Sequence, residues 1–248
     1  MRLITLGSGT CVPSLERSSP ANFIQIGRWK ILVDIGSSAL HQLQKASLSY
    51  KDIDMVFITH FHHDHVAGLG PFLQAQNWTP GFDRKKKLVL LGPPGLREHY
   101  EQFLRHRGAR QRPGTYRLII REIKRQAVFS GFKVYSHNVI HRPESIAYKF
   151  VAGKKSLVIS GDTDYDPGLA RFARGADLLL LECSFPDGHK VKGHLTPSEC
   201  GSIAKAAKAK RLVLTHLYPP FSDSQRLRQA KRVFPVTYLA QDLKGFPV

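Results

Sequence analysis

The chain has 248 residues, of which 42% are hydrophobic, and this composition is that of a globular protein that can bury a sizeable core. It contains no apolar run near the roughly eighteen residues that a membrane span requires, which excludes a membrane-spanning helix. Three widely spaced cysteines exclude a disulfide-rich scaffold and favour a cytoplasmic protein. Lysine and arginine number 37 against 19 acidic residues, and the net charge of +18 favours polyanionic partners.

Short apolar runs between turn residues predict strands along the whole chain. The predicted strands are 2–6, 22–26, 30–33, 55–59, 88–91, 132–135, 145–150, 156–159, 178–181, 212–214 and 236–239. Helical patterns alternate with them at 37–46, 94–103, 197–208 and 224–233. The third helix has a capping box and a first-turn proline in Thr196-Pro197-Ser198-Glu199. We therefore expect one layered α/β domain over residues 1–248, with an exposed basic loop at 105–118.

The stretch ITHFHHDHVAGL at 58–69 crowds imidazoles together where a predicted strand ends. Four of the six residues from His60 to His65 are histidines, and Asp64 lies among them. Strand ends are where α/β proteins place ligands, and imidazoles with a carboxylate are donors that zinc and similar metals favour. A turning loop can point His60 and His62 to one side and Asp64 and His65 to the other. This arrangement suits two adjacent metal ions.

Later strand ends are expected to supply further ligands. His141, Asp162 and His216 follow the strand-like runs FKVYSHNVI, SLVIS and RLVLT. A single histidine or aspartate in such a place is commonly a turn residue or a cap. Together with the first motif, however, these three residues predict the remaining ligands of a two-metal site.

With these motifs the chain resembles the metallo-β-lactamase fold family, whose signature is similar to THFHHDHVAGL. The resemblance implies a four-layer αβ/βα sandwich of two mixed β-sheets with helices outside, and two divalent ions as cofactors, Zn²⁺ or alternatively Mn²⁺. It implies that one ion is bound by His60, His62 and His141, the other by Asp64, His65 and His216, and both by Asp162. His63 is not expected to coordinate, and the sequence around His141 fits the family better than that around its rival His137.

Other segments resemble the branch that contains ribonuclease Z and related phosphodiesterases, namely LGSGTCVPS, VDIGSSALHQL, LGPPGL and GHLTPSE. In this branch His194 corresponds to a histidine that contacts the scissile phosphate, and Glu182 to the acidic residue that orients it. We therefore expect a phosphodiesterase in which a metal-bridging hydroxide attacks phosphorus. Asp64 would orient this nucleophile, and His194 would stabilise the phosphate or protonate the leaving oxygen.

One departure from this branch concerns the substrate. Ribonuclease Z enzymes that grip transfer RNA typically carry a long arm between the ligands that correspond to His141 and Asp162. Here 20 residues separate the two (162 − 141 − 1), enough for two strands and a tight turn at 152–155. Transfer-RNA processing by an endonuclease is therefore in doubt, and cyclic nucleotides and other small phosphodiesters compete with RNA as substrates.

A basic region at 84–125 is the alternative means of holding RNA. It has thirteen lysines and arginines against three glutamates, a local balance of +10. A solvated basic surface is an equally good interpretation, because no aromatic RNA-binding motif accompanies the charge. A homodimer is also expected from the resemblance.

Three other functions remain open. A thioesterase or lactamase of this fold does not require the pair formed by His194 and Glu182. A diiron oxidoreductase usually has a carboxylate at the position of His62, which disfavours that class. A non-catalytic nucleic-acid-binding protein with a structural metal site is disfavoured by the complete ligand set.

Overall fold

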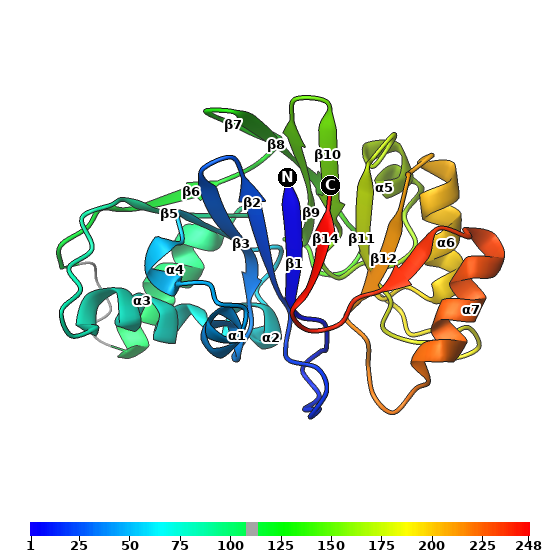
Figure 1. Cartoon of the computed structure of the whole chain (residues 1–248), viewed down its shortest axis with the longest axis horizontal. Helices are drawn as coiled ribbons and strands as arrows, with labels where there is room; N and C mark the ends of the chain where they lie inside the picture. Colours follow the sequence, from blue (N-terminus) through cyan, green and yellow to red (C-terminus); the bar gives the residue numbers. More distant parts are fainter. Residues whose placement is uncertain (108–113) are drawn as a thin grey trace.

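The structure is a computed structural model that describes residues 1–107 and 114–248 (Figure 1). Its strands form two seven-stranded sheets within these residues. In spatial order the first sheet consists of β14 (Lys244–Pro247), β1 (Arg2–Gly7), β2 (Ala21–Ile26), β3 (Trp29–Ile35), β4 (Met55–Phe57), β5 (Leu88–Gly92) and β6 (Leu118–Glu122). The second consists of β13 (Thr237–Leu239), β12 (Leu212–Thr215), β11 (Leu178–Glu182), β10 (Lys155–Ile159), β9 (Ile146–Ala152), β8 (Phe132–Asn138) and β7 (Gln126–Phe129).

Both sheets are mixed. The first is antiparallel from β14 to β3 and parallel from β3 to β6. The second is antiparallel from β7 to β10 and parallel from β10 to β13. Each sheet thus combines hairpins with crossover connections, as a mixed α/β sandwich requires.

The two sheets face each other across a core of apolar side chains, and helices cover their outer faces (Figure 1). Within the inner core, Phe57 packs edge-to-face against Tyr148 and Phe150. The outer helices are α1 (Ala39–Lys45), α2 (His63–Val66), α3 (Leu69–Trp78) and α4 (Leu96–Arg107) on the first sheet, and α5 (Pro167–Phe172), α6 (Pro197–Ala206) and α7 (Asp223–Val233) on the second. This arrangement confirms the predicted four-layer sandwich. No helix in the described residues is long and apolar enough to cross a membrane.

All eleven predicted strands and all four predicted helices occur, with ends that shift by a few residues. The sequence patterns missed β6, β7, β14, α2, α3 and α5. Helix α3 has Pro71 in its first turn, where proline is tolerated because the first N–H groups of a helix have no partner in the helix. The predicted loop 105–118 is wrong at its start, since α4 continues to Arg107. Its residues 108–113 lie outside the described part.

The metal motif is held close against the first sheet. The N–H of Gly68 donates to the carbonyl of Ile35 at the end of β3, over 2.8 Å. A Cβ on Gly68 would lie 2.4 Å from the carbonyl oxygen of Gly36, so only glycine permits this approach. The site lies where four strands end at their carboxyl ends. The residues that follow β4, β10, β11 and β12 meet there, among them His60, Asp162 and His216.

Candidate metal centre

The predicted ligands converge in two groups. His60, His62, His141 and Asp162 form one group, and Asp64, His65 and His216 form the other. In each group the candidate ligand atoms lie within 4.8 Å of one another. The closest contact in the first group joins His141 Nε2 to His62 Nδ1 at 3.2 Å, and in the second His216 Nε2 lies 3.4 Å from Asp64 Oδ2.

Asp162 stands between the two groups. Its Oδ2 lies 3.7 Å from His60 Nε2 and 3.8 Å from His141 Nε2. Its Oδ1 lies 3.4 Å from His65 Nε2 and 3.5 Å from His216 Nε2. One carboxylate oxygen therefore faces each group, as a bridging ligand would.

The histidines are oriented by partners on their outward nitrogens. His65 Nδ1 donates to Asp34 Oδ2 at 2.8 Å, and His141 Nδ1 donates to the carbonyl of Gly193 at 2.9 Å. His216 Nδ1 lies 3.0 Å from the hydroxyl of Ser184. Each contact favours a proton on Nδ1 and directs the lone pair of Nε2 to the centre of the site. Metal-binding histidines in proteins are commonly fixed in this way.

Asp34 also fixes the strand exit that leads into the motif. Its carboxylate accepts hydrogen bonds from the backbone N–H and the hydroxyl of Thr59, the residue directly before His60. Asp34 and His216 both have left-handed backbone angles, with φ of 60° and 57°. Such conformations are uncommon outside glycine and often mark functional sites.

Several buried polar atoms in the cluster lack a hydrogen-bond partner among the described residues. They are His60 Nε2, His65 Nε2 and Asp162 Oδ1. Burial, together with the neighbouring His65, lowers the pKa of His60 to about 2, so this imidazole is neutral. Orphaned buried atoms are costly unless something compensates them. Imidazole nitrogens and carboxylate oxygens that converge in this way are a donor set that fits divalent cations.

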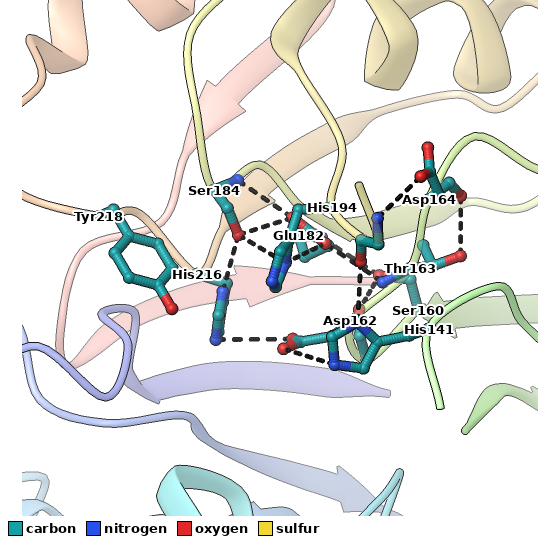
Figure 2. A network of polar contacts seen from close by, with 12 residues as sticks. His141, Ser160, Asp162, Thr163, Asp164, Glu182, Ser184, His194, His216 and Tyr218 are labelled. Carbon is teal, nitrogen blue, oxygen red and sulfur yellow. Dashed lines mark hydrogen bonds and ion pairs between the residues drawn. The ribbon is translucent and has the colours of Figure 1, made fainter. Parts of the chain in front are cut away.

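A second pair of titratable groups lies beside the cluster (Figure 2). His194 Nδ1 is 2.8 Å from Glu182 Oε1, and the imidazole of His194 stacks 5.8 Å from that of His216. Burial alone would lower the pKa of His194, but the hydrogen bond to Glu182, together with the charges of Glu182, Asp162 and Asp64, outweighs burial and raises the pKa. Glu182 also accepts the hydroxyl of Ser184 at 2.9 Å, so one carboxylate supports both histidines.

The loop before α6, which carries His194, is anchored by Lys190. The Lys190 ammonium donates to Asp164 Oδ1 at 2.6 Å, to the carbonyl of His194 at 2.6 Å and to Glu199 Oε2 at 2.7 Å. Asp164 accepts the N–H of Gly193 through its other oxygen, over 2.8 Å (Figure 2). Because the carbonyl of Gly193 holds His141, this network joins the loop to the metal cluster.

The two rival histidines of the sequence motifs, His63 and His137, lie away from the clustered ligands. His63 is exposed at the start of α2. His137 Nε2 is 2.9 Å from Asp166 Oδ2, and its ring stacks on Phe172. The structure therefore brings His141 rather than His137 to the cluster. Four supporting residues were not predicted from the sequence, namely Asp34, Ser184, Asp164 and Lys190. Only Asp34 stands where the sequence could have indicated a site residue, at the end of an apolar run.

Two described members of the basic region 84–125, Arg84 and Lys86, are engaged within the protein. Arg84 is buried and donates to the carbonyls of Lys51, Ile53, Lys86 and Lys87, so its charge stabilises a turn. Lys86 pairs with Asp54. Residues 108–113 of the region lie outside the described part.

Comparisons with known proteins agree with this geometry. Ribonuclease Z of Archaeoglobus fulgidus is 28% identical over 307 aligned positions that cover 100% of this chain and 97% of the relative. Ribonuclease Z of Pyrococcus furiosus is 27% identical, covering 98% and 94%. Among solved structures, the metallo-β-lactamase fold protein YhfI from Bacillus subtilis has a TM-score of 0.86 at 26% identity, covering 99% and 98%. Human tRNase Z, short form, has a TM-score of 0.81 at 25% identity, covering 100% and 99%.

The fold and the site define a metallo-β-lactamase fold protein of the ribonuclease Z-like branch, and hence a metal-dependent hydrolase. A family model described as "Anti-Pycsar protein Apyc1" matches residues 1–234. Because this match spans most of the chain, the protein belongs to that family.

The Lys190 anchor predicts a measurable change in the loop. In Lys190→Met, amide hydrogen exchange of residues 191–195 should accelerate at least tenfold, because three charge-assisted hydrogen bonds are lost while β11 remains protected. Exchange measured by mass spectrometry checks this, with Lys192→Met as the matched control on the same loop. Equal exchange in the two variants would show that Lys190 does not anchor the loop.

Proposed function

We propose that this protein is a phosphodiesterase that acts on small phosphodiesters, cyclic nucleotides included. The observation that carries the proposal is the His194–Glu182 pair beside the two ligand groups. A hydrolase of carboxylic or thioester substrates can use the ligand groups alone. A phosphodiester, in contrast, develops negative charge on phosphoryl oxygens and has an alkoxide leaving group, and both suit a nearby imidazolium.

Two divalent ions, Zn²⁺ with Mn²⁺ as the alternative, fit the donor set. His60, His62 and His141 would hold one ion, Asp64, His65 and His216 the other, and Asp162 both. When bound, the ions supply Lewis acidity and an activated water. Three imidazoles for one ion and a mixture of imidazole and carboxylate for the other match the preferences of zinc.

His194 and Glu182 provide the protein's own contribution to the reaction. Glu182 occupies Nδ1 of His194 and favours its protonated form, which leaves Nε2–H to contact a phosphoryl oxygen or protonate the leaving oxygen. Ser184 and the N–H of Thr163 hold Glu182 in turn, at 2.9 and 3.1 Å. Asp64 would orient the attacking water, because its carboxylate lies among the ligand atoms of the second group.

The hairpin between β9 and β10 favours a small substrate. Ala152 pairs with Lys155, so a two-residue turn stands where the relatives that grip transfer RNA typically carry an arm. The alignment with Archaeoglobus fulgidus ribonuclease Z is at least 59 positions longer than this chain (307 less 248). RNA is the second candidate substrate, favoured by the net charge of +18 and by the name of these relatives.

The domain organisation, location and assembly of the protein are also proposals. We propose that the whole chain, 1–248, acts as one cytoplasmic domain and assembles as a homodimer, as its resemblance to this branch implies. A thioesterase, a lactamase and a non-catalytic nucleic-acid-binding protein are the competing functions. A substrate panel with the metal-loaded protein separates them.

Substitution of His194 tests its role directly. In His194→Ala, kcat on a phosphodiester should fall about a hundredfold or more, since a positioned acid is lost, while metal content stays unchanged. His63→Ala is the matched control in the motif, because His63 is exposed, and it should retain full activity. Loss of metal together with activity in His194→Ala would instead make His194 a ligand or a structural residue.

The substrate panel separates small diesters from RNA. We expect turnover of 2′,3′- or 3′,5′-cyclic nucleotides and of an aryl phosphodiester, with weak dependence on salt because few phosphates are contacted. A 3′-extended precursor tRNA should be a poor substrate. Efficient cleavage of the tRNA that falls steeply with salt would favour RNA instead. Failure on every diester, with thioester or lactam turnover, would contradict the proposed function.

A further inference from the structure

Two aromatic side chains lie directly beside His194 and His216, a third packs against them, and none has a role in the proposed chemistry. We call Phe185, Tyr218 and Phe221 the aromatic shelf. Phe185 and Tyr218 stack with centroids 4.8 Å apart and planes 19° apart, and Phe221 meets Phe185 edge-to-face at 6.0 Å. Phe185 directly follows Ser184, and Tyr218 lies two residues beyond His216. The shelf is therefore built on the same two strand ends as the site.

Tyr218 is the member of the shelf that borders the catalytic groups. Its ring centroid lies 5.7 Å from that of His216 and 6.2 Å from that of His194, at interplanar angles of 71° and 72°. Its hydroxyl lies 3.3 Å from the sulfur of Cys11. Figure 2 shows the ring next to His216, at the margin of the polar network. Phe185 thus covers one face of Tyr218, and the two imidazoles approach the ring at steep angles.

Tyr218 lines a cavity of about 240 Å³. Its wall includes Pro219, Pro220 and Phe221, which are rigid and apolar, and the charged residues Glu16 and Arg17. The Arg17 guanidinium is fixed by the hydroxyl of Ser8 and by the carboxylate of Asp223. The cavity therefore combines an aromatic wall with a rigid polar rim.

These features fit a flat ring better than an aliphatic chain. A nucleobase or aryl ring that enters the cavity can extend the Phe185–Tyr218 stack by one member, and polar edge atoms of such a ring can meet the charged rim. Tyr218 is in contact with His194 and His216, so a ring stacked on it would lie next to the residues that surround the reacting phosphorus. An aliphatic ester group would gain no stacking there.

We propose that the cavity beside Tyr218 is a binding subsite for the nucleobase or aryl ring of the substrate, with Tyr218 as the stacking platform. This inference rests on the proposed phosphodiesterase function. It adds a determinant of specificity, because phosphodiesters with a flat ring would bind more tightly than those without one. Tyr218 is a substrate-binding residue in this account, and the metal ligands do not depend on its ring.

Direct binding to the metal-loaded protein tests the subsite without relying on turnover. Isothermal titration compares adenosine 5′-monophosphate with ribose 5-phosphate, which has the same phosphate and sugar but no base. The wild type should bind the nucleotide about tenfold to a hundredfold more tightly, the range expected for stacking of one base. Tyr218→Leu should reduce this ratio to near one while its affinity for ribose 5-phosphate and its metal content remain those of wild type. Tyr218→Phe should keep most of the ratio.

Tyr238→Leu removes an exposed tyrosine on β13 and should leave the ratio unchanged. A wild-type ratio near one, or a ratio that survives in Tyr218→Leu, would overturn the subsite. A fall in both affinities together would assign Tyr218 a structural role beside His216 and would also overturn it. If the ratio is present but no phosphodiester is hydrolysed, the proposed function fails while the subsite stands.

Discussion

The structure depends on the cost of placing imidazoles and carboxylates together away from water. His60, His65, His216 and Asp162 are almost completely buried, and three of their polar atoms have no hydrogen-bond partner among the described residues. Burial of unpaired polar and charged groups is unfavourable by several kcal/mol unless partners compensate. The convergence of imidazole nitrogens with the carboxylates of Asp64 and Asp162 is compensated best by divalent cations. The rest of the site serves to hold these groups against their mutual repulsion.

The sandwich supplies the rigidity that such a cluster requires. Aromatic packing between the sheets and the parallel strands β4, β10, β11 and β12 set the positions from which the ligands emerge. Outward partners such as Asp34, Ser184 and the carbonyl of Gly193 then fix each imidazole ring. Lys190 extends this support to the loop that carries His194. The sheets thus fix the positions of the ligands, and hydrogen bonds fix His194 beside them.

Much of this site could be predicted from the sequence, because metal ligands leave a local pattern. The histidine-rich motif and the three strand ends at His141, Asp162 and His216 stand out by residue type and position. The supporting residues do not, since Ser184 and Lys190 acquire their roles only when distant segments meet. The same limit applies to the fold. Strand β14 is a short edge strand that ends with a proline, and its pairing with β1 is a contact between the two ends of the chain. From the sequence, Arg84 is part of the predicted basic surface. In the structure it is buried and binds backbone carbonyls of a distant segment, those of Lys51 and Ile53.

Two structural features bear on the size of the proposed substrate. The short β9–β10 hairpin closes with a two-residue turn between Ala152 and Lys155. The aromatic shelf lies beside His194 and His216 and next to a cavity of about 240 Å³. Both features favour a compact diester, and they depend on different segments of the chain.

The central claim is that the buried cluster is a two-ion site, and its most direct measurement is the metal content of the protein with its stability. Native mass spectrometry after loading with Zn²⁺ should find two ions per chain, and the unfolding temperature should fall when a chelator removes them. Asp162→Ala should reduce the content below two, whereas His63→Ala should retain both ions. A protein that binds no ion, and whose unfolding temperature is the same with and without chelator, would contradict the account.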